Sequence, residues 1–220
     1  MKSLIDGAPS FGHVHVDLAK GESVVAENDA MSSMSAKIDL KAILNGGFFS
    51  AMGKKFLGGE TFFVNRFTNS ADIEQRVTLV PPTPGDLMEF ALDGKALYLQ
   101  KGAFLARTPE VKMKVRWAGF RSAIAGEGLF RLMATGTGIL WFGAYGGIVE
   151  RQVDGELIVD SGHLVASEPG IKMRIRKAGG IFSSFFGKEG LVALLKGSGK
   201  VYIQTRSVSG LASWLNPRFR

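Results

Sequence analysis

The sequence predicts an all-β fold built from short antiparallel strands, and three observations carry that prediction. Apolar and β-branched runs are brief and are bounded by Asp-Gly or Gly turn signals, as on both sides of residues 157–159. Charged and apolar residues alternate from 172 to 176, which is the period of a half-buried strand. The 220 residues include 29 glycines, a usage typical of strands joined by tight turns.

An internal repeat divides the chain into three related segments. The run DGKALYLQKGAFLA from Asp93 matches DGELIVDSGHLVA from Asp154, and KMKVR from Lys112 matches KMRIR from Lys172. With a weaker copy at the start of the chain, the segments cover residues 12–85, 86–147 and 148–210, and no linker separates them. We therefore predict a single domain over residues 1–220, with the segments arranged around a pseudo-threefold axis. Residues 211–215 are predicted to form a short helix that caps the strands.

The composition and the N-terminal sequence limit where the protein can act, but they do not identify a partner. The formal net charge is +7, from 27 basic and 20 acidic residues, which suits either an anionic partner or an ordinary soluble protein. Cysteine is absent, so disulfides and cysteine-ligated metals are excluded. The N-terminus lacks the apolar stretch of a secretory signal, and no run of about 18 apolar residues is present. We expect a cytoplasmic protein.

Several strand and turn segments resemble one known family. They are GGETFFVNRF from Gly58, the tripeptide at residues 84–86, GAFLA from Gly102, VDSGHLVA from Val159 and GSGKVYIQTR from Gly197. The family is the mitochondrial-biogenesis family named for altered inheritance of mitochondria, and the resemblance covers about residues 12–207. It implies a double-stranded β-helix-like fold akin to the tryptophan RNA-binding attenuation protein, and it supplies no catalytic residues. Because a transit peptide is missing, a bacterial or archaeal member fits better than the eukaryotic branch, which is tied to the mitochondrial inner membrane.

Three glycine-phenylalanine loops, at residues 46–56, 117–128 and 178–190, occupy the same place in each segment. A pseudo-threefold axis would gather them at one end of the domain, as a surface that touches a membrane or a partner. A phenylalanine removed from water there contributes about 1.5–3 kcal/mol. The alternative is that these side chains fill the core or the joins between segments. The candidate surface residues are Phe48, Phe49, Lys54, Lys55, Phe56, Phe120, Arg121, Phe182, Phe185 and Phe186.

A stripe of basic residues recurs on one strand of each segment. Each group has three charged residues two positions apart, so it lies on one strand face, and the one acidic member is Asp39, between Lys37 and Lys41. Such a stripe suits phosphate groups of lipid or nucleic acid, or it is a solvated face that prevents aggregation through a sheet edge. The candidate anion-binding residues are Lys37, Lys41, Lys112, Lys114, Arg116, Lys172, Arg174 and Arg176.

The chain has three histidines, which are candidate metal ligands. His13 and His15 are two apart on a predicted strand, so both point to one face, and His163 would complete a three-histidine site. The glycine and glutamate spacing that surrounds such a pair in cupins is missing. We therefore expect no metal and no cofactor.

The leading functional hypothesis is a non-enzymatic scaffold, or a protein that binds a membrane or a partner. No catalytic constellation is evident, because no Gly-x-Ser-x-Gly elbow is present and cysteine is absent. We expect a homo-oligomer that is cytoplasmic and peripheral to the inner face of the membrane. The first alternative is an RNA-binding ring, by analogy of fold alone. The second is a small-ligand or metal-binding β-helix protein.

Overall fold

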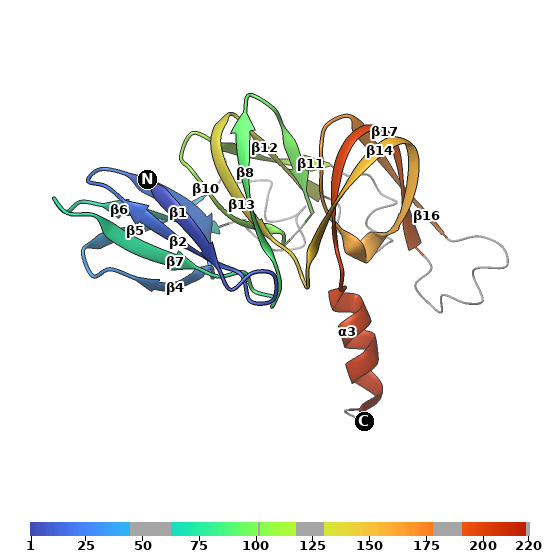
Figure 1. Cartoon of the computed structure of the whole chain (residues 1–220), viewed down its shortest axis with the longest axis horizontal. Coiled ribbons are helices and arrows are strands. Elements are labelled where there is room, and N and C mark those ends of the chain that lie inside the picture. Colours follow the sequence, from blue (N-terminus) through green and yellow to red (C-terminus); the bar gives the residue numbers. More distant parts are fainter. Residues whose placement is uncertain (45–62, 101, 118–129, 178–190, 219–220) are drawn as a thin grey trace.

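The structure is a computed structural model of the chain, and it describes residues 1–44, 63–100, 102–117, 130–177 and 191–218. Within these ranges the fold is nearly all β, with antiparallel sheets, which confirms the fold class predicted from the sequence. The structure has three sheets: the first packs with the N-terminal strands of the second at one end of the long axis, and the third extends from the middle to the other end (Figure 1). The last of them curls into a half-barrel.

The strand order of each sheet is as follows. The first sheet has the order β1 (Lys2–Asp6), β2 (His13–Leu18), β7 (Gln75–Leu79), β4 (Met31–Met34). The second has the order β5 (Ile38–Leu44), β6 (Phe63–Asn69), β3 (Ser23–Glu27), β10 (Phe104–Arg107), β13 (Thr137–Gly143), β8 (Leu87–Asp93). The third has the order β11 (Lys112–Trp117), β12 (Phe130–Thr135), β9 (Leu97–Leu99), β15 (Leu164–Ser167), β17 (Leu191–Gln204), β14 (Ile148–Asp160), and β16 (Ile171–Lys177) also pairs with β17.

Strand pairing and packing both cross the boundaries between the predicted segments. Strand β3 of the first segment pairs with β10 of the second, and β9 of the second pairs with β15 of the third. One core cluster contains Val64, Leu140 and Tyr202, which come from the first, second and third segments. The segments therefore share a core in this structure. The pseudo-threefold axis and the exact segment bounds stay predictions.

The hairpin of β1 and β2 illustrates how an alternating sequence determines the two faces of a sheet. In the HVHVDL sequence of β2, Val14, Val16 and Leu18 are buried. The intervening His13 and His15 are half-buried on the opposite face, because successive side chains of a strand point to opposite sides. Strand β1 runs antiparallel beside β2, and the outer face of this hairpin carries both histidines.

The chain ends in helix α3 (Val208–Leu215), followed by the 3-10 turn η4 (Asn216–Arg218), and a further 3-10 turn, η1 (Ser161–His163), follows β14. Ser207 caps α3, since its Oγ accepts a hydrogen bond from the Gly210 N–H at 3.1 Å. The predicted helix is thus present, but it starts at Val208 and none of its residues is buried. Instead of capping the strands, it projects from them (Figure 1).

Neither α3 nor any other helix in the described ranges combines the length and the apolar character needed to cross a membrane.

Candidate functional site

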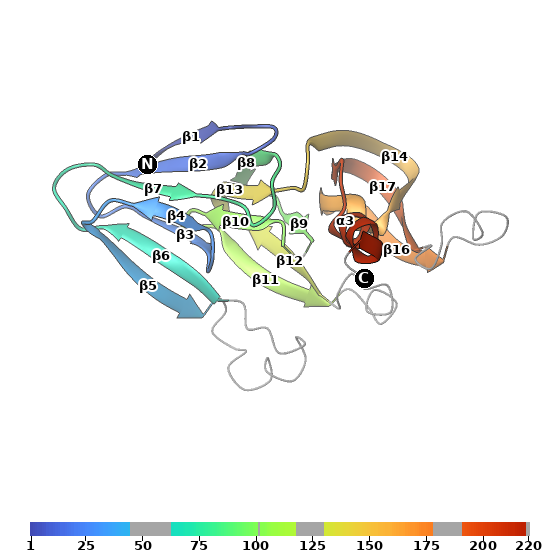
Figure 2. The ribbon, with the colours of Figure 1, turned by 90° about the horizontal axis from the view of Figure 1, so that it is seen from below.

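The basic residues predicted to bind anions lie on, or directly beside, three edge strands. Strands β5 and β11 each stand at the end of a sheet, and β16 has β17 as its one neighbour among the described strands. Figure 2 shows β5, β11 and β16 along the lower side of the molecule, spread over its length. An edge strand exposes backbone hydrogen-bonding groups as well as side chains. Among the described strands, none pairs with the outer edges of β5, β11 and β16.

Six of the eight predicted anion-binding side chains are described, and all six are exposed. On β11, for example, Lys112 and Lys114 point outward while Met113 between them is buried. The side chains of Arg116 and Arg176 lie outside the described residues. We call the described set the basic edge: Lys37, Lys41, Lys112, Lys114, Lys172 and Arg174.

The cations of the basic edge differ from several other exposed lysines in forming no ion pair within the described residues. Within the described ranges, no aspartate or glutamate oxygen lies within 4.0 Å of any of its six cations. By contrast, Lys200 on β17 pairs with Glu150 at 2.7 Å, and Lys2 on β1 pairs with Glu74 at 3.7 Å. Lys2 and Lys200 are thus ion-paired, whereas the cations of the basic edge are not, as is also true, in the described part of the chain, of the exposed Lys95 and Arg151. Asp39 lies between Lys37 and Lys41 on β5 without forming an ion pair with a described cation.

A further cation, Arg131 on β12, lies on the same sheet face as Lys114. Arg131 stands opposite Arg116, which is two residues from Lys114. The Arg131 Nη2 donates a hydrogen bond to the Ser167 Oγ at 2.9 Å, and the guanidinium carbon lies 5.1 Å from the centroid of the Tyr98 ring. Burial lowers the pKa of Arg131 to about 10.

Arg131 adds to the uncompensated charge of this face, since no carboxylate of the described ranges pairs with it. Its Nε is buried without a hydrogen-bond partner there. Sequence reasoning misses this residue because it stands alone between apolar neighbours, outside the alternating basic pattern.

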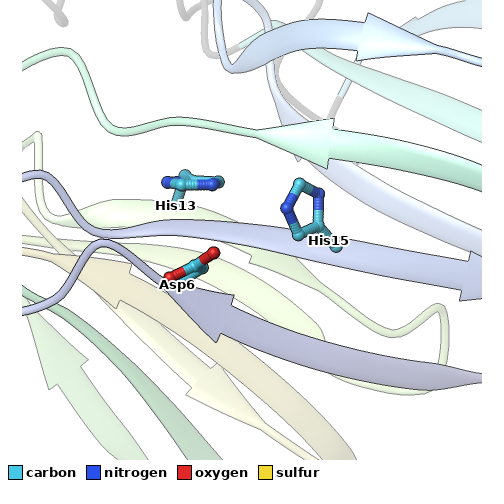
Figure 3. Close-up of side chains that lie close together, drawn as sticks. All are labelled: Asp6, His13 and His15. Carbon is cyan, nitrogen blue, oxygen red and sulfur yellow. The ribbon is translucent and has the colours of Figure 1, made fainter.

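The three histidines do not form one group. His13 and His15 lie side by side on β2, with ring centroids 4.9 Å apart and planes at 87°. His163 lies in η1, where its Nδ1 is 2.7 Å from the backbone oxygen of Gln204. The residue that joins the histidine pair is Asp6 of β1, directly opposite His13 in the hairpin (Figure 3). Sequence reasoning misses Asp6, because only the hairpin register brings residue 6 beside residue 13.

Helix α3 exposes an apolar face. Val208, Leu211 and Trp214 follow one another at helical spacing and are 55%, 39% and 56% exposed. The guanidinium carbon of Arg218 lies 4.0 Å from the centroid of the Trp214 ring, a cation–π contact. From residue 190 to the C-terminus the sequence has five basic residues and no acidic ones. The helix is therefore both apolar on one face and set in a positively charged segment.

Apart from residue 117, which ends β11, the three glycine-phenylalanine loops lie outside the described residues, within the ranges 45–62, 118–129 and 178–190. This holds for all ten of their candidate surface residues. The prediction that these loops form one surface stays a prediction.

Comparisons with known proteins identify the family of the chain. A family model described as mitochondrial biogenesis AIM24 matches residues 4–206. An uncharacterised protein of Streptococcus pyogenes serotype M6 is 28% identical over 224 residues, which cover 98% of this chain and 90% of that protein. A crystal structure of a Streptococcus pyogenes protein, from a structural genomics consortium, is 27% identical with a TM-score of 0.81, and the match covers 99% of each chain. Because the family model spans nearly the whole sequence, the chain belongs to the mitochondrial biogenesis AIM24 family.

Proposed function

We propose that this protein is a non-enzymatic binding protein that attaches reversibly to an anionic membrane surface from the cytoplasm. The observation that carries the proposal is the basic edge: six exposed cations lie along one side of the molecule, and none of them forms an ion pair with a described carboxylate. Each lysine or arginine near an anionic membrane contributes about 1 kcal/mol. Several of them together give attachment that is reversible and is weakened by salt.

The exposed helix α3 favours a lipid surface over a nucleic acid. Trp214 and Leu211 present exposed apolar area beside the cationic Arg218, and tryptophan is enriched where a protein meets the membrane–water interface. Recognition of single-stranded RNA uses aromatic rings as stacking platforms. Near Lys114, the ring of Tyr98 already carries the Arg131 guanidinium. A homo-oligomer, as the sequence predicts, would repeat the basic edge and raise the avidity for a surface.

Vesicle flotation of the full chain tests the proposal. We expect the protein to float with phosphatidylcholine vesicles that contain about one third phosphatidylserine, and to remain at the bottom with pure phosphatidylcholine. Replacing Lys112→Gln and Lys114→Gln together removes about 2 kcal/mol of attraction, so partitioning falls roughly 30-fold. The matched control, Lys2→Gln with Lys20→Gln, removes the same charge from lysines that already pair with Glu74 and Asp72, and leaves partitioning nearly unchanged.

A second variant tests the contribution of α3 separately. Trp214 is more than half exposed, so its insertion into lipid is expected to shift its fluorescence to shorter wavelength. Trp214→Ser should weaken flotation while leaving the dependence on phosphatidylserine in place. The proposal fails if the wild-type chain does not float with anionic vesicles at low salt. It also fails if the chain binds single-stranded RNA in a salt-dependent way and ignores vesicles, which would establish the RNA-binding alternative.

A further inference from the structure

We infer that Asp6, His13 and His15 form a binding site for a divalent transition-metal ion, of which zinc is the ion to test. The inference is independent of the proposed membrane attachment, because the three residues lie on the β1–β2 hairpin and not on the basic edge. One ligand atom from each residue lies within 4.8 Å of the other two (Figure 3). Two imidazoles and one carboxylate are a ligand set that suits such ions and leaves coordination positions for water.

The backbone of the hairpin explains why the three side chains converge. Asp6 ends β1 and His13 begins β2, and the two residues face each other directly in the antiparallel register. His15 is two residues further along β2, so it lies on the same face as His13. The residues are therefore brought together by regular strand geometry, which fixes their backbones at the positions that Figure 3 shows.

The hydrogen bonds of His13 determine which ring nitrogen is available to a metal. Its Nδ1 lies 3.2 Å from the backbone oxygen of Phe11. A carbonyl oxygen only accepts hydrogen bonds, so Nδ1 carries the proton and the neutral ring keeps its lone pair on Nε2. Metal-binding histidines are commonly oriented in this way, with one nitrogen donating to a backbone carbonyl and the other binding the ion.

Similar contacts hold the other two ligands. The His15 Nδ1 lies 2.9 Å from the Thr78 Oγ1 on the neighbouring strand β7. A hydroxyl can accept as well as donate, so in the tautomer that donates from Nδ1 to Thr78 the lone pair of Nε2 is left for an ion. The backbone N–H of Gly7 donates a hydrogen bond to Oδ1 of Asp6, at 2.7 Å. This bond does not involve the second carboxylate oxygen. Each candidate ligand thus has one atom held by a neighbour and one atom left to bind.

The Asp6 carboxylate and the rings of His13 and His15 lie close together without bonding to one another. In the described part of the chain, no hydrogen bond or ion pair joins the Asp6 carboxylate to either ring. Ligand atoms around a tetrahedral zinc lie about 3.3 Å apart, since the zinc–nitrogen and zinc–oxygen bonds are each about 2 Å long. Asp6 is exposed and can rotate toward the rings, so a modest side-chain movement closes the present separation.

Titration of the full chain with zinc chloride, followed by calorimetry, tests the site. We expect about one ion per chain, and at least about tenfold weaker binding for His13→Gln, His15→Gln and Asp6→Asn. Asp6→Asn is the mildest change, because the asparagine oxygen still accepts the Gly7 hydrogen bond while the charge is lost. The control is His163→Gln, which removes the remaining histidine from η1 and should bind zinc like the wild type.

A spectroscopic measurement on the wild-type chain keeps the inference testable even if a variant folds poorly. Cobalt added in place of zinc should give visible absorption bands that zinc displaces. In nuclear magnetic resonance spectra, zinc should move the ring signals of His13 and His15 and leave those of His163 unchanged. The inference is overturned if zinc gives no saturable binding, or if folded His15→Gln binds zinc as tightly as the wild type. Equal weakening by His163→Gln would overturn it as well.

Discussion

The ring of Phe142 on β13 packs edge-on against the ring of Tyr202 on β17, with centroids 5.5 Å apart and planes at 71°. Phe142 lies in the second predicted segment and Tyr202 in the third. Phe90 on β8 joins them, with its centroid 6.0 Å from that of Tyr202. Val64 of the first segment belongs to the same core cluster. The contact therefore stands at the place where the three segments share their interior.

Removing the Phe142 ring should destabilise the whole chain rather than one segment. Phe142 is fully buried, and truncation of a buried phenylalanine to alanine costs about 3–5 kcal/mol. We expect Phe142→Ala to lower the free energy of unfolding in urea by that amount, with circular dichroism and tryptophan fluorescence reporting one coincident transition. The exposed Ile158→Ala on β14 is the control and should cost less than about 0.5 kcal/mol. Two separate transitions would contradict the shared core.

Tyr202 should make stability fall at alkaline pH. Burial raises the pKa of Tyr202 to about 12, and the charges of Glu150 and Glu168 add to this. The unfolded chain ionises the phenol near its usual pKa of about 10, so between about pH 10 and 12 the unfolded state releases this proton and the folded state keeps it. Stability is therefore lost as the pH rises through that window.

The variant Tyr202→Phe has no phenol to ionise at this position, and it isolates the effect. Urea unfolding at about pH 9, 10, 11 and 12 should show a smaller loss of stability for the variant than for the wild type. Equal losses in the two proteins would show that Tyr202 ionises in the folded state as it does in the unfolded chain.

Periodicity predicted the faces of strands well, because the direction of a side chain depends on its own strand alone. The alternation around Met113 and within β2 correctly indicates which residues are buried and which point outward. Which strands become neighbours depends on register and on contacts between distant parts of the chain. This is why the pairing of β3 with β10, and the approach of Asp6 to His13, could not be predicted from the pattern.

The exposed helix could not be recognised for a related reason. The apolar spacing of α3 predicts a helix with one apolar face, and such a face is most often buried against the rest of the protein. The sequence does not say whether a covering surface exists. In the structure Trp214 and Leu211 remain exposed, which turns a predicted structural cap into a candidate binding element.

Gly138 should tolerate no larger residue, because two constraints coincide there. Its φ is +145°, a backbone conformation rarely adopted by residues with a side chain, and a Cβ would lie 2.1 Å from the Thr108 Oγ1. We expect Gly138→Ala to lower the free energy of unfolding by more than about 2 kcal/mol. Gly94 also has a positive φ, +70°, but open space around it, so Gly94→Ala should cost only about 1 kcal/mol. Urea unfolding measures both variants: Gly138→Ala combines backbone strain with a clash, whereas Gly94→Ala has the strain alone. An equal loss of unfolding free energy in the two would show that the contact with Thr108 does not matter.

Thr78 should act as a positioning residue for zinc, although it is not expected to touch the ion. Its Oγ1 holds the Nδ1 of His15 at 2.9 Å, and loss of such a contact behind a metal ligand weakens binding about 10- to 100-fold. Thr78→Val removes the hydroxyl but keeps the branched shape that suits β7. Calorimetry should therefore show about tenfold weaker zinc binding with unchanged thermal stability, whereas the same change at Thr68 on β6 should leave zinc binding intact. If Thr78→Val binds zinc like the wild type, the hydroxyl does not orient His15 for the ion.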